Sequence, residues 1–196
     1  MITPPRTGNP TPALTGTVLL CMVAVVTACS HGPNEARARN ATTTPQTPMT
    51  AEQNRTRNEA DVRALVDGLA TAIRARAIDG VMAVYSPDLV AFDIVPPLQY
   101  VGAASFRKVW QEVFALYQDP IQYEVRDLTI TAGDDVAFSH SLNRINGAMK
   151  DGRQAGLWLR WTAGYRKIHG RWLIVHLQAS VPVDMANGKP ALDLVP

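Results

Sequence analysis

Residues 121–181 read IQYEVRDLTITAGDDVAFSHSLNRINGAMKDGRQAGLWLRWTAGYRKIHGRWLIVHLQASV. Along most of this stretch apolar and polar side chains alternate, which is the period of strands that bury one face. Turn-forming residues interrupt the alternation at Gly133-Asp134, Lys150-Asp151-Gly152 and His169-Gly170. The predicted strands span about 121–132, 136–149, 154–168 and 172–181. Because short turns join the last three, we expect these strands to form an antiparallel meander.

Two amphipathic helices are predicted before the meander. The first should begin near Asn58 and end before Gly80. Its apolar positions, spaced three and four residues apart, are Val62, Leu65, Val66, Leu69, Ala72, Ile73 and Ala77. The second ends at Asp119-Pro120 and carries Phe106, Val109, Trp110, Val113, Phe114 and Tyr117. A short helical turn at 81–85 and a strand at 89–95 are expected between the two helices.

The order of these elements predicts the fold class. Helices followed by a meander are typical of α+β domains in which the helices cover one face of a sheet. A long twisted sheet curves around such helices and leaves room for a pocket at its open end. We therefore expect a cone-shaped α+β domain at residues 58–196, with a curved, mostly antiparallel sheet and helices on its concave face.

The N-terminal region carries targeting signals. Residues 17–28, TVLLCMVAVVTA, form an apolar run of twelve residues, whereas a membrane-spanning helix needs about 20. The run has the length of a signal peptide core, and Val26-Thr27-Ala28-Cys29 resembles a lipobox. We therefore predict a signal peptide at 1–28 and a diacylglycerol on Cys29, which would anchor the protein to the extracytoplasmic face of the cell membrane. The alternative is an ordinary signal peptide followed by an incidental cysteine.

Residues 29–57 are predicted to be the lipidated cysteine and a disordered tether. The segment contains ATTTPQTPMT and almost no large apolar side chain. Such a composition cannot bury enough surface to offset the entropy lost on ordering. We therefore expect a spacer between the membrane and the domain.

Composition excludes several classes of function. The formal net charge is +2, from 19 basic and 17 acidic residues, which gives no electrostatic footprint for nucleic acid. The two cysteines are Cys21 and Cys29, so the predicted domain contains neither a disulfide nor a thiolate metal site. The sequence shows no P-loop, Rossmann glycine pattern, zinc motif or nucleophile elbow. We therefore predict no cofactor, no metal and no nucleic-acid partner.

Six stretches of the predicted domain carry a family resemblance. They are FDIVPPLQYVG (92–102), PIQYEVRDLTI (120–130), DVAFSHSLNRING (135–147), WLRWT (158–162), YRKIHGRWLIVH (165–176) and SVPVDMANGKPALDLVP (180–196). Together they resemble the ketosteroid isomerase homologues, a SnoaL-like subgroup of the nuclear transport factor 2-like superfamily. The resemblance implies a cone-shaped fold, a small apolar pocket and a homodimer. It does not imply one reaction, because this fold hosts many functions.

Asp93 is the strongest candidate for a catalytic residue. It has apolar neighbours and precedes Pro96-Pro97. Burial among apolar groups raises the pKa of a carboxyl, which suits a general base. Counted from Asp79-Gly80, the resemblance places Asp93 where the isomerase has its catalytic aspartate. The alternative is an aspartate that only accepts a hydrogen bond from a turn.

The same resemblance argues against steroid isomerisation. The isomerase holds its enolate with two neutral hydrogen-bond donors. Leu69 and Ala163 occupy the corresponding positions here, and neither side chain can donate. A donor of this kind commonly lowers the activation free energy by a few kcal/mol.

His140 and Arg144 are the next catalytic candidates. Phe138, His140, Leu142 and Arg144 alternate onto one face of their strand, and alignment to the family points this face into the pocket. Arg144 would then pair with Asp93 or bind a ligand carboxylate, and His140 could transfer protons near neutral pH. The alternative is a salt-bridged strand surface on the outer face.

The remaining candidates are aromatic or apolar. We expect the pocket to be lined by Leu69, Tyr100, Trp110, Phe114, Trp161 and Tyr165, with Tyr123 as a further aromatic candidate. Core packing would explain the aromatic ones equally well. Two stripes at strand spacing, Trp158-Arg160-Thr162 and Trp172-Ile174-His176-Gln178, are more typical of packing or of a dimer face. The subgroup often carries His-Glu-His in the second stripe, but His176-Leu177-Gln178 is a poor ligand set for a transition metal.

Three functions are consistent with these features. The first is a membrane-anchored module that binds a small apolar or carboxylate-bearing molecule. The second is an isomerase-like or related acid–base enzyme with Asp93 as the general base. The third is a cell-envelope interaction domain that dimerises through its sheet.

Overall fold

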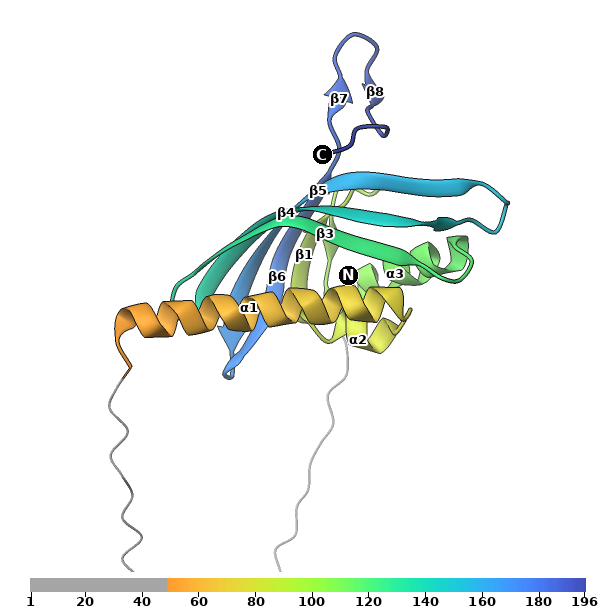
Figure 1. The fold of residues 1–196 in the computed structure, drawn as a ribbon. Helices are drawn as coiled ribbons and strands as arrows, with labels where there is room; N and C mark the ends of the chain where they lie inside the picture. The colour runs from red at the N-terminus through yellow and green to blue at the C-terminus, as the bar shows by residue number, and fades with distance from the viewer. Residues whose placement is uncertain (1–48) are drawn as a thin grey trace, which may run out of the picture. The chain divides into compact units, whose positions relative to one another are not determined.

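The computed structural model describes residues 49–196 (Figure 1). The predicted signal peptide, Cys29 and most of the predicted tether lie outside the described residues. Within residues 49–196, no helix combines the length and the apolar character needed to cross a bilayer.

A six-stranded curved sheet forms the body of the domain. Its strands are β1 (Tyr85–Phe92), β2 (Tyr100–Val101), β3 (Gln122–Ala132), β4 (Val136–Ala148), β5 (Gln154–Ile168) and β6 (Arg171–Ser180). They lie in the order β2-β1-β6-β5-β4-β3, and only β1 and β6 run parallel. The predicted meander is confirmed, with strand ends within one residue of those expected for β3 to β6. The sheet is open, with β2 and β3 at its edges.

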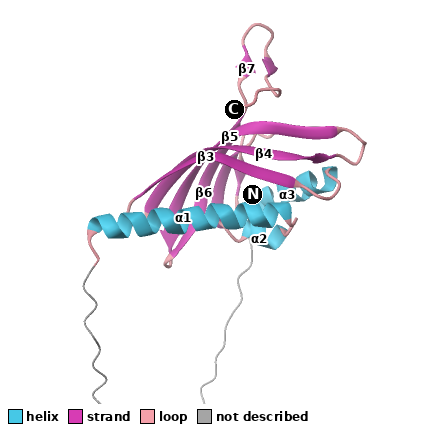
Figure 2. Cartoon of the chain, viewed as in Figure 1, coloured by secondary structure: helices cyan, strands magenta, loops and turns pink. Residues whose placement is uncertain are grey.

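Three helices lie on the concave face of this sheet, as predicted (Figure 2). They are α1 (Ala51–Arg74), α2 (Ile78–Met82) and α3 (Ala103–Leu116). The Arg76 guanidinium joins the end of α1 to the end of α3, since it donates to the carbonyls of Phe114 and Tyr117 and to the Asp119 carboxylate. The helices therefore form one wall of the space that the curved sheet encloses.

The start of α1 corrects the prediction of a tether up to residue 57. The helix begins at Ala51, not near Asn58, because Thr50 and Gln53 form a reciprocal capping box. The Thr50 hydroxyl accepts a hydrogen bond from the Gln53 amide at 3.2 Å, and the Gln53 side chain accepts one from the Thr50 amide at 2.8 Å. The first two turns bury little surface, so they show no apolar period in the sequence.

Asn58 ties α1 to the sheet instead of starting the helix. Its side chain is buried, and its amide group donates to the Gly133 carbonyl at 2.7 Å. Its carbonyl oxygen accepts a hydrogen bond from the Lys167 ammonium, also at 2.7 Å. The helix is thereby fixed to the β3–β4 turn and to β5.

The C-terminal residues add an element that the sequence did not predict. Strands β7 (Val183–Asp184) and β8 (Lys189–Pro190) form a separate two-stranded hairpin. This hairpin projects from the end of the sheet, away from the helices (Figure 1). Val183 and Pro190 nevertheless form part of a groove beside the sheet, described below.

Candidate functional site

A small cavity lies between α3 and the inner face of β3 to β5. Its volume is about 230 Å³, below the range of about 300–1,000 Å³ common for drug-sized ligands. It is lined by Asp93, Ile94, Val95, Phe106, Val109, Trp110, Val113, Leu116, Tyr117, Tyr123, Ile145, Leu157, Leu159 and Trp161. Asp93 is the one charged side chain in this lining, so the cavity combines an apolar wall with a single carboxylate.

Asp93 follows directly after the last residue of β1, at the mouth of the cavity. One carboxylate oxygen accepts a hydrogen bond from the Ile94 amide at 2.6 Å. Burial raises the pKa of the Asp93 carboxyl above its ordinary value, and the hydrogen bond from Ile94 opposes that rise. The second carboxylate oxygen has no hydrogen bond among the described residues, so it is available to a ligand.

A wider groove of about 680 Å³ lies on the other side of Asp93. It is lined by Phe92, Asp93, Ile94, Leu98, Gln99, Gln178, Ala179, Ser180, Val181, Val183 and Pro190. Asp93 and Ile94 line both spaces, so they form the wall that the cavity and the groove share.

The prediction that His140 and Arg144 enter the pocket is wrong. Ser139 is fully buried on the inner face of β4, whereas Phe138 is 50% exposed and His140 is exposed on the outer face. Because successive strand residues alternate between faces, Arg144 also lies on the outer face, away from Asp93. The period of two defines the sets of residues that share a face but not which set is buried.

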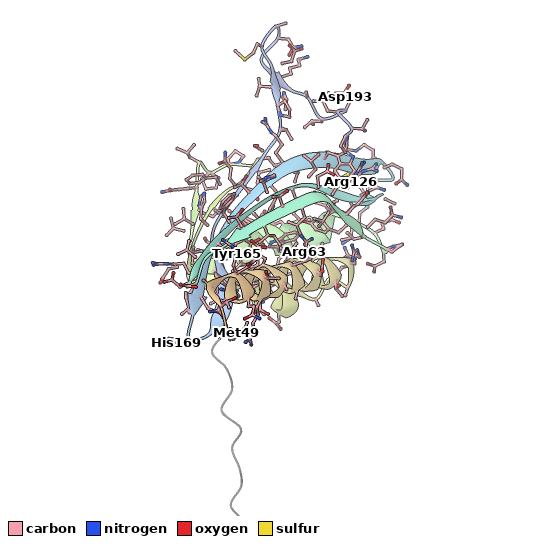
Figure 3. All side chains as sticks on the ribbon, turned by 60° about the vertical axis from the view of Figure 1, so that its left-hand side comes forward. Met49, Arg63, Arg126, Tyr165, His169 and Asp193 are labelled. Atoms are coloured by element: carbon pink, nitrogen blue, oxygen red, sulfur yellow. The ribbon has the colours of Figure 1, made fainter. Side chains whose placement is uncertain are left out.

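On the outer face, Arg126 and Arg144 contact the ring of Trp158 and not an acidic side chain. The guanidinium carbon of Arg126 lies 5.6 Å from the centre of the Trp158 ring, and that of Arg144 lies 5.9 Å from it. Neither arginine forms an ion pair within residues 49–196. The two guanidinium groups therefore interact with the face of an aromatic ring. Figure 3 shows Arg126 on this side of the sheet and Tyr165 on the side of α1.

Small polar side chains occupy the inner face of β4. The Ser141 hydroxyl donates to the Asn143 amide oxygen at 2.7 Å, and the Asn143 amide nitrogen donates to the Tyr123 hydroxyl at 2.9 Å. The Ser139 and Tyr165 hydroxyls share a hydrogen bond of 2.8 Å. Burial raises the pKa of Tyr165 to about 12, and the hydrogen bond with Ser139 opposes the rise. This network was not predicted, because the opposite face of β4 was expected to lie inside.

The predicted pocket residues have different surroundings. Trp110 and Trp161 line the cavity, and so does Tyr123. Leu69 and Tyr165 are buried in the core but do not reach the cavity wall. Phe114 packs on Trp110 at 5.7 Å between ring centres, and the Tyr100 hydroxyl donates to the Pro96 carbonyl outside the cavity. The lining residues that were not predicted are mostly aliphatic and come from α3, β4, β5 and the segment that follows β1.

The stripe from Trp172 to Gln178 is divided by a bulge. Tyr165 pairs with Ile174 and Gly164 pairs with His176, so Val175 is the extra residue. Trp172 and Ile174 are therefore buried on the inner side, while the His176 ring packs on Phe92 at 4.9 Å between ring centres. The His176 Nδ1 atom lies 2.9 Å from the Val90 carbonyl oxygen. Within the described part of the chain, no three His, Cys, Asp or Glu side chains gather to hold a metal.

Comparisons with known proteins agree with this architecture. The SnoaL-like domain family matches residues 62–184. A nuclear transport factor 2-like protein of unknown function from Pseudomonas putida is 34% identical, with a TM-score of 0.66 over 72% of this chain and 98% of that chain. No curated protein matches the sequence significantly.

More distant solved structures share the fold. A ketosteroid isomerase-like protein from Erwinia carotovora is 22% identical, with a TM-score of 0.54 over 64% of this chain and 98% of that chain. A nuclear transport factor 2-like superfamily protein from Salmonella enterica is 13% identical, with a TM-score of 0.59 over 68% of this chain and 97% of that chain. The predicted nuclear transport factor 2-like α+β fold is therefore confirmed.

Proposed function

The chain belongs to the SnoaL-like domain family, and from this premise we propose that its cavity binds a small, neutral, largely apolar molecule. Members of this family often bind small molecules. The observation that carries the proposal is the cavity between α3 and the sheet, because its wall is apolar apart from one carboxylate. Its volume of about 230 Å³ favours a ligand of one or two rings.

The charge of the lining supports a neutral ligand. None of the residues that line the cavity is arginine, lysine or histidine. An anionic ligand would lose its hydration without gaining a cation, and it would face the Asp93 carboxylate. Since Arg144 lies on the outer face, the carboxylate-bearing ligand considered in the sequence analysis loses its anchor. The free oxygen of Asp93 instead suits a hydroxyl or N–H group.

Binding can be tested with a cavity-filling variant. We expect neutral bicyclic compounds such as indane to change the fluorescence of Trp110 and Trp161 and to raise the melting temperature. Val113→Phe places a ring in the cavity and should weaken binding at least tenfold. Val136→Phe is the matched control, since Val136 is 51% exposed on the outer face. Equal binding by the two variants would contradict the proposed cavity.

A second candidate function is proton transfer with Asp93 as the general base. The supporting observation is that burial raises the pKa of Asp93 at the mouth of an apolar cavity. The carboxylate would remove a proton from the carbon beside a carbonyl group, and the electron pair of that C–H bond would move toward the carbonyl oxygen. The test follows deuterium exchange at that carbon of 1-indanone in heavy water. We expect the protein to accelerate exchange and Asp93→Asn to abolish the acceleration while binding persists.

We also propose that Cys29 carries the lipid that holds the domain at the extracytoplasmic face of the cell membrane. The lipobox-like Val26-Thr27-Ala28-Cys29 supports this assignment. Cys29→Ser should move the protein from the membrane fraction to the soluble fraction. Cys21→Ser is the matched control, because cleavage after Ala28 removes that cysteine. Membrane retention of the Cys29 variant would contradict the proposal. Homodimerisation stays a prediction, which sedimentation of the purified domain can check.

A further inference from the structure

The sequence contains two Asn-Gly pairs, and the fold gives them contrasting surroundings. Asn187-Gly188 lies in the turn between β7 and β8, whereas Asn146-Gly147 lies inside β4. An asparagine followed by glycine can lose its side-chain amide without an enzyme. The reaction is easiest at glycine, because no Cβ shields the backbone nitrogen from the neighbouring side chain. The surroundings of each pair therefore decide which asparagine reacts.

The turn holds the Asn187 amide at both ends. Its Nδ2 atom donates to the Asp184 carboxylate at 2.6 Å, and its Oδ1 atom accepts a hydrogen bond from the Lys189 backbone amide at 2.8 Å. The second bond favours attack on the side-chain carbon, since a donor on the carbonyl oxygen stabilises the negative charge that develops there.

The peptide group between Asn187 and Gly188 is accessible. Apart from its chain neighbours, no heavy atom lies within 4 Å of the position that a Cβ on Gly188 would take. The Gly188 amide donates to the Asp184 carbonyl at 2.8 Å, and this bond must open before the nitrogen can react. The hairpin projects from the domain (Figure 1), and a two-stranded hairpin is only marginally stable by itself, so such opening is frequent.

Asn146 has the same neighbour in sequence but lies in a fixed backbone. Strand β4 is paired on both sides here, with Asn146 opposite Gln122 of β3 and Gly156 of β5. Gly147 is buried, and a Cβ at this position would lie 3.2 Å from the Tyr117 ring. Attack by the Gly147 nitrogen would require β4 to separate from both neighbouring strands, which costs much of the stability of the domain.

We propose that Asn187 is a site of spontaneous deamidation and that its products open the β7–β8 hairpin. The Gly188 nitrogen loses its proton to solvent, and its electron pair forms a bond to the Cγ atom of Asn187. The bond from Cγ to Nδ2 breaks, and that nitrogen takes a proton from solvent and leaves as ammonia. Water then opens the resulting cyclic imide at either carbonyl, which gives aspartate or isoaspartate at position 187. The reaction needs no ligand, so it goes beyond the proposed function.

The products replace a hydrogen bond with a repulsion. A carboxylate oxygen takes the place of the Asn187 Nδ2 atom, which now donates to the Asp184 carboxylate, and two like charges in contact repel. Isoaspartate also lengthens the main chain within the turn. The pairing of Val183 with Pro190 is therefore lost. Because both residues line the groove beside Asp93, that side of the groove opens.

Peptide mass spectrometry follows the reaction in the purified protein. During incubation at mildly alkaline pH, we expect Asn187 to convert at least about tenfold faster than Asn146, since only Asn146 requires β4 to unfold. Both aspartate and isoaspartate should form at position 187, and an isoaspartate methyltransferase labels the second product. Equal rates at the two asparagines, or no conversion at Asn187, would overturn the proposed site.

A pair of variants tests the effect on the hairpin. Asn187→Asp reproduces one product, and Asn187→Ala is the matched control, since it removes the same hydrogen bonds without adding a charge. Hydrogen exchange at the Ala191 amide reports pairing, because this amide donates to the Pro182 carbonyl at 2.9 Å. We expect this amide to be at least about twofold less protected in Asn187→Asp than in Asn187→Ala. Equal protection in the two variants would overturn the opening of the hairpin by charge.

Discussion

The inner and outer faces of β4 carry opposite chemistry. The inner face presents Ser139, Ser141 and Asn143, which are neutral, buried and hydrogen-bonded to tyrosines or to one another. The outer face presents His140 and Arg144, which are more polar and less buried. A guanidinium inside the cone would need an anion, whereas a hydroxyl or amide needs one neutral partner. The small neutral side chains are therefore those that face the interior of the domain.

The largest difference between the two faces is expected for two tryptophans on β5. Trp161 is 8% exposed and lines the cavity, whereas Trp158 lies on the outer face in contact with the guanidinium groups of Arg126 and Arg144. Trp161→Ala should lower the free energy of unfolding by about 3–5 kcal/mol and abolish indane binding. Trp158→Ala should cost about 1–2 kcal/mol, from two cation–π contacts, and leave binding intact. Urea unfolding measures the change in stability, and fluorescence titration measures binding. A larger loss of unfolding free energy in Trp158→Ala than in Trp161→Ala would contradict the expected difference between the faces.

The next largest difference is expected for two neighbours on β4. Asn143→Leu leaves the Ser141 and Tyr123 hydroxyls without their partner, so the free energy of unfolding should fall by about 2–3 kcal/mol. Arg144→Leu removes one guanidinium from the Trp158 ring and should change it by less than about 1 kcal/mol. Both substitutions create the same side chain, so they compare the two sites directly. Similar costs at both positions would show that the inner network adds little to stability.

The faces of β4 also mark the limit of what the sequence predicts. The period of two and the turns were sufficient to predict β3 to β6. They could not decide which half of β4 is buried, because Phe138 and Leu142 make the outer set the more apolar one. The neighbouring strand settles the matter: Ser139 pairs with Ala163, and Ser141 pairs with Trp161, whose large side chain fills the interior. That pairing depends on the β4–β5 register, which the sequence does not specify.

Other features of the structure differed in whether the sequence could predict them. The capping box of Thr50 and Gln53 was visible in the sequence, but it precedes a segment with no apolar period. The bulge at Val175 appears in the sequence only as a change of phase, because the apolar positions Trp172 and Ile174 are followed by Leu177 and Ala179. Asp93 was identifiable because an acidic residue ends an apolar strand. The hydrogen bond between Asn143 and Tyr123 was not, since its partners come from two strands that only the folded sheet brings together.

A smaller contrast is expected between Ser139 and His140. Ser139→Ala removes the hydrogen-bond partner of the buried Tyr165 hydroxyl and should lower the free energy of unfolding by about 1 kcal/mol. His140→Ala changes an exposed side chain and should alter it by less than about 0.5 kcal/mol. Neither variant should change the affinity for indane. Loss of binding or of carbon-proton exchange in the His140 variant would restore the catalytic role that the sequence analysis considered.

The smallest expected effect is the pH dependence that Asp93 adds to stability. Burial raises the pKa of this carboxyl in the folded protein, so the folded state holds its proton to higher pH than the unfolded state does. Stability therefore falls as pH rises from the ordinary value of 3.8 through the folded pKa, and Asp93→Asn removes this loss. The variant should be more stable than wild type at neutral pH, by less than about 1 kcal/mol, and the advantage should vanish below about pH 3.8.

Asp151 is a control for this pH dependence, because the fold shifts its pKa in the opposite direction. Hydrogen bonds from Arg153 lower the pKa of this exposed carboxyl, so any stability that it adds is present above its ordinary pKa and is lost as pH falls. Asp151→Asn should therefore be equal to or less stable than wild type at neutral pH, and any difference should vanish in acid. Urea unfolding from pH 3 to pH 8 compares the two variants. If Asp93→Asn followed the pattern of Asp151→Asn, the Asp93 carboxylate would be stabilised by the fold, and its assignment as a general base would fail.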